Sequence, residues 1–148
     1  MIRATIAGAI YFGIVFAFGF AFGTIRVLVL VPRFGTLAAV LAELPLIVTV
    51  SWLTCQRLIK WFSVPRCVLP RLMMGGAAFA ILMLAEAGLS VVAFRQPVSA
   101  FVAGWATLPG ALGLAGQVAF GFFPLILSST FRNFLVRDHH VMTQKISS

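Results

Sequence analysis

The chain has 148 residues, of which 61% are hydrophobic and only 9% are charged, and its formal net charge is +8. A water-soluble globular protein normally has about a quarter of its residues charged, so this composition excludes that class and predicts an integral membrane protein. We expect an all-α, polytopic fold, a four-transmembrane-helix bundle with a kinked fourth helix.

Long stretches without charge predict where the chain crosses the membrane, because a spanning helix needs about 20 mostly apolar residues. We expect one transmembrane domain over residues 1–148, with spans at residues 4–31, 34–58, 72–94 and 98–124. Arg3 before the first apolar run also fits a cleaved secretory signal, which would leave three spans. The apolar run is longer than the core of about 7–15 residues in a typical signal, so we favour a first span.

The last apolar stretch, Gln96 to Phe131, is 36 residues long, which is too long for one upright helix. Pro109-Gly110 predicts either a kink in the fourth span or a short re-entrant or interfacial piece before it, and we favour the kink. Residues 125–137 are expected to form a helix on the membrane surface, although a longer fourth span explains them almost as well. Residues 138–148 are expected to form a mobile tail.

Lysine and arginine are unevenly divided between the two sides that four spans would create. Eight lie on the side of the termini, namely Arg3, Arg57, Lys60, Arg66, Arg71, Arg132, Arg137 and Lys145, against Arg26, Arg33 and Arg95 on the other. Because positive residues accumulate in short cytoplasmic connections, we expect both termini in the cytoplasm, with the protein in a bacterial inner membrane. The positive charge then attracts anionic lipid headgroups. A nucleic-acid partner is not expected, because no water-exposed domain offers a basic face.

The acidic residues give the strongest functional signal. The chain has three, Glu43, Glu86 and Asp138, and the first two fall inside predicted spans. An ionised side chain at the bilayer centre costs at least about 2.5–3.5 kcal/mol, so each needs a partner, a proton or water. Arg26, Glu43 and Glu86 lie about 9, 12 and 13 Å below the outer ends of their spans, so all three can meet at one level.

We therefore predict a buried charge cluster in which Arg26 bridges Glu43 and Glu86, with Ser90 as a supporting polar group. Two carboxyls and one guanidinium leave an unbalanced charge, and like charges in a poorly hydrated site resist joint ionisation. One glutamate is therefore expected to keep its proton. The cluster either holds helices in register or serves as a proton or solute site, and the sequence leaves both alternatives open.

Small residues recur on the first span, where they permit close approach of helices in lipid. We predict helix packing through Gly13, Ala17, Gly19 and Gly23. Packing within one bundle and homo-oligomerisation both fit this spacing, and we favour packing within the bundle.

Motifs for catalysis and cofactor binding are not visible in the sequence. Cys55, Cys67, His139 and His140 lack the paired spacing of a zinc site, so no metal ligands, catalytic residues or cofactors are expected. The sequence favours a small non-catalytic inner-membrane protein, a subunit or assembly module whose partners are lipid and other membrane-protein subunits or a copy of itself. The alternative is a proton-coupled small-solute transporter acting as an oligomer.

Overall fold

The computed structural model describes residues 2–65, 67–92 and 95–146, with side chains as far as Leu127. Within these ranges the chain is helical and has no strand. Its elements are α1 (Ile2–Ile25), the π-helix η1 (Arg26–Leu30), α2 (Val31–Trp61), α3 (Val68–Val92), α4 (Val98–Gly104) and α5 (Leu108–Ile146).

Three helical segments are long and apolar enough to cross a membrane: Ile2–Trp61, Val68–Val92 and Leu108–Leu127. Many large apolar side chains on these helices are exposed, among them Phe18, Leu46 and Leu84. Such a surface suits contact with lipid, because soluble monomers rarely expose large apolar areas. The structure therefore supports the expected all-α integral membrane protein.

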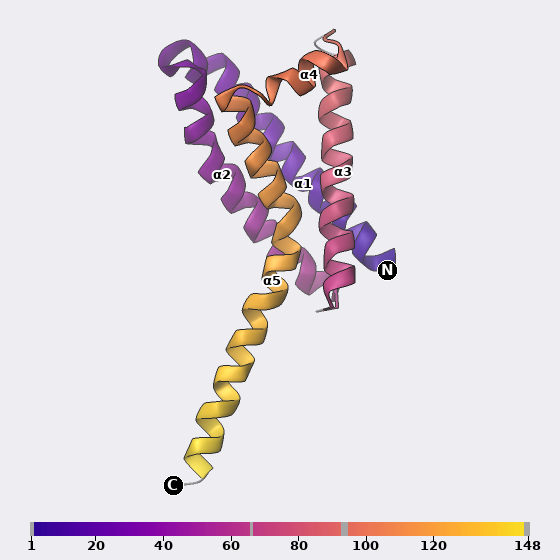
Figure 1. The fold of residues 1–148 in the computed structure, drawn as a ribbon, viewed down its shortest axis with the longest axis vertical. Coiled ribbons are helices and arrows are strands. Elements are labelled where there is room, and N and C mark those ends of the chain that lie inside the picture. Colours follow the sequence, from indigo (N-terminus) through magenta and orange to yellow (C-terminus); the bar gives the residue numbers. More distant parts are fainter. Residues whose placement is uncertain (1, 66, 93–94, 147–148) are drawn as a thin grey trace.

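The segment Ile2–Trp61 reverses direction near Gly35, so that α1 and α2 pack side by side (Figure 1). Gly35 has φ 79° and ψ 167°, a backbone conformation that essentially only glycine adopts. The π-helix η1 comes directly before this turn, and the N–H of Val31 donates to the carbonyl of Arg26, five residues earlier. A π-helical turn accommodates one extra residue, and such turns are frequent at functional sites.

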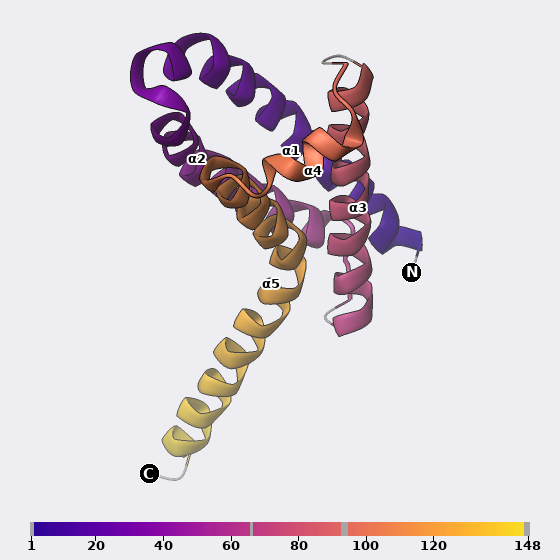
Figure 2. The same ribbon diagram turned by 45° about the horizontal axis from the view of Figure 1, so that its top comes forward.

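The long helices form a ring in which α1 packs against α2 and α3, and α5 packs against the same two helices (Figures 1 and 2). The lower half of the bundle is defined as the part that contains the start of α1, the connection between α2 and α3, and Pro124. The upper half contains the turn at Gly35, η1, α4 and the start of α5. In both views α1 and α3 cross in the lower half and diverge towards the upper half, where α4 lies between the ends of α3 and α5.

The expected single kinked helix over residues 98–124 is not confirmed, because the chain there forms two helices, α4 and α5. Thr107 is the reason that α5 starts where it does. Its hydroxyl oxygen accepts a hydrogen bond from the N–H of Gly110 at 3.2 Å, which is the geometry of a helix N-cap. Pro109 then lies in the first turn, where the missing N–H has no cost. Pro109-Gly110 therefore begins a helix instead of bending one.

Helix α5 continues beyond the bundle as a regular backbone helix to Ile146 (Figure 1). It includes both residues 125–137, expected as a membrane-surface helix, and most of the expected tail from residue 138. Side chains after Leu127 lie outside the described part of the chain, so the surface position of residues 125–137 stays a prediction.

Close contacts through glycine define the lower half. A Cβ added to Gly8 of α1 would lie 2.5 Å from the carbonyl oxygen of Met74 on α3. A Cβ on Gly75 would clash with the carbonyl oxygen of Gly121 on α5. Both distances are below ordinary contact, so α3 approaches its two neighbours at backbone distance, as small residues permit in membrane helices.

Tyr11, the only tyrosine in the chain, compensates for a proline inside α5. Pro124 has no N–H, so the carbonyl of Phe120, four residues earlier, loses its helical donor. The buried Tyr11 hydroxyl donates to this carbonyl at 3.2 Å, and its ring stacks on Phe120 with centroids 4.3 Å apart. This hydrogen bond links α1 and α5 across the bundle.

Arg71 is buried near the start of α3, with only 4% of its surface exposed. Its guanidinium donates to the carbonyls of Pro65, Pro124 and Val64 at 3.1, 3.4 and 3.5 Å. These acceptors belong to the connection after α2 and to α5, so one side chain ties three parts of the lower half together. Carbonyl oxygens thus solvate a charge that would be costly to bury alone.

Candidate functional site

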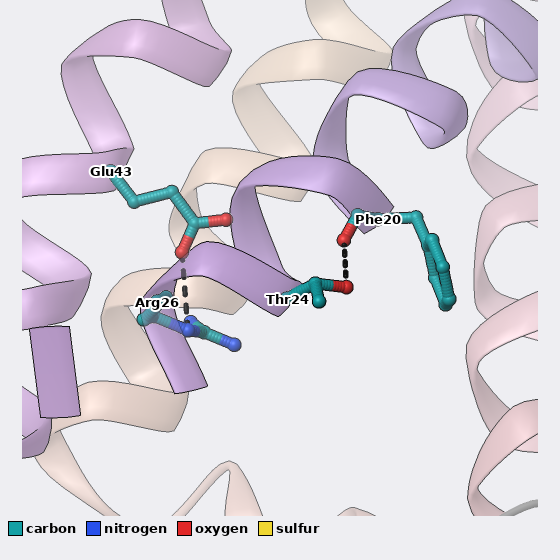
Figure 3. Close-up of polar contacts among 4 residues, drawn as sticks. All are labelled: Phe20, Thr24, Arg26 and Glu43. Atoms are coloured by element: carbon teal, nitrogen blue, oxygen red, sulfur yellow. Dashed lines mark hydrogen bonds and ion pairs between the residues drawn. The ribbon is translucent and has the colours of Figure 1, made fainter. Parts of the chain in front are cut away.

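The first polar contact of the upper half is an ion pair between Arg26 and Glu43. Arg26 is the first residue of η1, and Glu43 lies on α2 two residues before Pro45. The Arg26 Nε and Glu43 Oε2 atoms are 3.2 Å apart (Figure 3). The Glu43 side chain is 13% exposed and that of Arg26 is 33% exposed, so the carboxylate is the more buried partner.

Gly23 lies next to the Glu43 carboxylate. A Cβ added to Gly23 would lie 4.0 Å from Glu43 Oε1, an ordinary contact distance, so the carboxylate lies beside this turn of α1. On the same turn of α1, the Thr24 hydroxyl donates to its own helix, to the carbonyl of Phe20, at 2.8 Å (Figure 3). Thr24 is therefore satisfied locally and is not a partner of the ion pair.

The second polar contact joins Glu86 on α3 to Gln117 on α5. The Gln117 Nε2 atom lies 2.7 Å from Glu86 Oε1 and 2.6 Å from Glu86 Oε2, so one amide group donates to both carboxyl oxygens. The other end of the amide is different. Gln117 Oε1 is buried and has no hydrogen-bond partner among the described residues.

The two polar contacts lie at one level of the bundle. Leu44 follows Glu43 on α2, and its Cδ2 atom would lie 3.5 Å from a Cβ on Gly116, the residue before Gln117 on α5. Arg26 is also near enough to Glu86 to interact with it electrostatically. We call Arg26, Glu43, Glu86 and Gln117 the polar layer.

The predicted bridge of Arg26 to both glutamates is only partly present. Arg26 pairs with Glu43, but no ion pair within 4.0 Å links it to Glu86 in the described part of the chain. Gln117, and not Arg26, is the side chain that contacts Glu86, because α5 lies between α2 and α3 in the ring. Ser90, the predicted supporting group, is buried near the end of α3, where its backbone carbonyl accepts a hydrogen bond from the N–H of Gln96 at 3.0 Å. The side chain that supports Glu86 is Gln117 instead.

The predicted packing residues of α1 divide into two groups. Gly13 and Ala17 are exposed, and nothing lies within 4 Å of a Cβ placed on Gly13. Gly19 and Gly23 face α2, where a Cβ on Gly19 would lie 3.7 Å from Ile47. The favoured packing within the bundle therefore does not use Gly13 or Ala17.

Sequence reasoning missed Gln117, Tyr11 and Arg71. Gln117 is the only amide side chain between residues 98 and 124, and Tyr11 is the only tyrosine, so rarity was the available signal for both. Arg71 was counted only as a charge of a connecting loop. Its burial depends on α5, which the loop sequence does not show.

Among the described side chains, no group of three or more His, Cys, Asp or Glu residues is placed to hold a metal ion. Cys55 is buried and Cys67 is exposed, and both are free thiols. His139 and His140 lie outside the described side chains, so the expectation about these histidines stays untested.

Comparison of the chain with protein-family models, curated proteins and solved structures finds no match. Its function therefore has to be inferred from its own residues.

Proposed function

We propose that the protein is a small non-catalytic protein of a bacterial cytoplasmic membrane, acting as a subunit or assembly module of a larger membrane complex. The observation that carries this proposal is an unused small-residue face on α1. Ala9, Gly13, Ala17 and Ala21, spaced four residues apart, are all exposed. The glycines that bring helices together within the chain are others, namely Gly8, Gly75 and Gly121.

A helix face of this kind suits a second membrane helix better than lipid alone. In a bilayer, apolar burial does not drive helix association, and close backbone approach through small residues contributes instead. We define Ala9, Gly13, Ala17 and Ala21 as the α1 face and propose it as the surface that contacts another subunit or a second copy of the chain.

The proposal includes four spans with both termini in the cytoplasm. The reversal at Gly35 supports two spans within Ile2–Trp61, because each arm has about 30 residues and a helix rises about 1.5 Å per residue. The excess of Lys and Arg on the side of the termini supports the orientation.

Native purification in mild detergent tests the assembly proposal. We expect stoichiometric co-purification of other membrane subunits, and we expect Ala17→Leu to reduce their recovery at least tenfold. Ala80→Leu is the matched control, because Ala80 is an exposed alanine on α3 and the same side chain is added. A monomer with no partner, or equal partner recovery in both variants, would contradict the proposal.

A proton-coupled small-solute transporter acting as an oligomer is the second candidate. The polar layer favours it, since ionisable groups inside membrane spans commonly mark proton or solute pathways. Proton release on solute addition, abolished by Glu43→Gln or Glu86→Gln in a folded protein, would support transport. No release with any solute tested, while both variants only lose stability, would favour a structural role for the polar layer.

A further inference from the structure

The Glu86–Gln117 contact contains two features that a purely structural tie does not require. One amide nitrogen is shared by both oxygens of a carboxyl group, and the amide oxygen beside it is buried without a hydrogen-bond partner in the described part of the chain. Buried polar atoms are normally satisfied, so an unsatisfied one at a site calls for an explanation.

We propose that Glu86 and Gln117 form an exchangeable proton site inside the bundle, in which the two ends of the Gln117 amide serve the two forms of the carboxyl. The ionised carboxylate is acceptor-only and therefore needs donors, and the Gln117 Nε2 atom lies 2.7 and 2.6 Å from its two oxygens. The protonated carboxyl carries an O–H that needs an acceptor. Rotation of the terminal amide by about 180° would present Oε1, which has the required lone pairs.

The exchange balances without any other reactant. Hydronium gives one proton to a Glu86 oxygen and leaves as water, so one O–H bond of hydronium breaks and one O–H bond forms on Glu86. The reverse step returns the proton to water. Gln117 forms and breaks only hydrogen bonds. It is a positioning residue, because the proton is carried by Glu86.

The surrounding charges distinguish Glu86 from the other intramembrane acid. Glu43 Oε2 is also buried without a hydrogen bond among the described residues, but it lies 3.2 Å from Arg26 Nε, so the negative charge of Glu43 has a matched positive partner. Glu86 is bonded to a neutral amide, and Arg26 reaches it only through space. From α4, residues 98–104 contribute no charged side chain. Ionised Glu86 is stabilised by the amide and by the field of Arg26, whereas neutral Glu86 avoids the cost of a buried charge.

Such a site is distinct from the assembly role and would supply the exchanging group of the transport alternative. The test therefore uses the purified full chain in lipid nanodiscs, with neither a partner nor a solute present. A negative result then removes the proton site and leaves the assembly proposal standing.

Infrared difference spectroscopy between acid and alkaline buffer reports the C=O stretch of a protonated carboxyl directly. We expect one titrating band from a buried carboxylic acid, absent in Glu86→Gln and retained in the matched variant Glu43→Gln. Gln117→Leu removes the amide but keeps the acid. We expect it to move the midpoint of the band to higher pH by about one unit, because a hydrogen bond to a charged group is stronger than one to a neutral group.

Loss of the band in Glu43→Gln with retention in Glu86→Gln would overturn the proposal, as would a parent protein with no titrating band. A midpoint unaffected by Gln117→Leu would also overturn it, because the amide would then play no part in either form. If Glu86→Gln does not fold, Gln117→Leu alone decides between these outcomes.

Discussion

The lower and upper halves of the bundle are held together in different ways. In the lower half α3 approaches α1 and α5 at backbone distance, through Gly8 and Gly75, and the buried polar side chains Tyr11 and Arg71 donate to backbone carbonyls. In the upper half α1 and α3 diverge (Figure 2), and the contacts between helices include an ion pair and a carboxyl–amide pair. The lower half therefore has little room for rearrangement, whereas the proton exchange that we propose for Glu86 needs only a rotation of the Gln117 amide.

Gly75→Ala is expected to have the largest effect, since it breaks the closest packing in the lower half. The added methyl would clash with the carbonyl oxygen of Gly121, so α3 and α5 must separate. Overpacking of this kind costs about 3 kcal/mol of unfolding free energy, measurable by unfolding in mixed detergent and SDS. Gly76→Ala is the control, because nothing lies within 4 Å of its Cβ position. Equal stability of the two variants would show that the lower half is not tightly packed.

Gly35→Ala tests the turn of the upper half. With φ 79° and ψ 167°, alanine is strained there although nothing lies within 4 Å, and we expect a loss of about 2 kcal/mol in the same unfolding assay. Gly13→Ala is the control, because nothing lies within 4 Å of its Cβ position either. Gly13 lies inside α1, where alanine is favoured over glycine by up to about 1 kcal/mol. A neutral Gly35→Ala would mean that the chain reverses with a different backbone.

Glu43→Gln is expected to destabilise the upper half by about 1–2 kcal/mol, because Arg26 loses its counter-charge. Breaking a fully buried ion pair costs about 3–5 kcal/mol, and the loss expected here is smaller because the Arg26 side chain is 33% exposed. The double variant Arg26→Met/Glu43→Leu should recover most of the loss, as apolar replacement of an ion pair is often neutral. If instead the destabilisation of the double variant equals the sum of the destabilisations of the two single variants, the two side chains do not interact.

Tyr11→Phe is expected to have the smallest effect, about 1 kcal/mol, because the stacking on Phe120 remains and only one hydrogen bond is lost. The effect should shrink when Pro124→Ala restores an N–H donor to the same carbonyl. A double-mutant cycle of unfolding free energies measures this coupling. A coupling of zero would show that Tyr11 does not compensate for the proline.

Particular residues show how far sequence reasoning reached. Composition predicted the membrane and the helices. Counting residues from the outer end of each span placed Arg26 near the level of Glu43, although Arg26–Leu30 forms a π-helix and the count assumed an α-helix. Depth could not assign Glu86 its partner, since that depends on which helix stands beside which. Pro109-Gly110 fitted either a kink or a short piece before the last span, and the favoured kink is not confirmed, because the capping of α5 by Thr107 depends on the three-dimensional turn.

The sequence alone determined the class of the protein, since a chain with 61% hydrophobic and 9% charged residues can satisfy its backbone in lipid by forming helices. Tertiary structure alone decided that Gln117 binds Glu86, that Tyr11 completes the proline-broken turn of α5, and that the α1 face is left outside the bundle. The physical reason is that lipid and a neighbouring helix offer an apolar residue nearly the same environment. Hydrophobicity therefore marks the spans, whereas the close steric and polar contacts between helices set their order in the bundle.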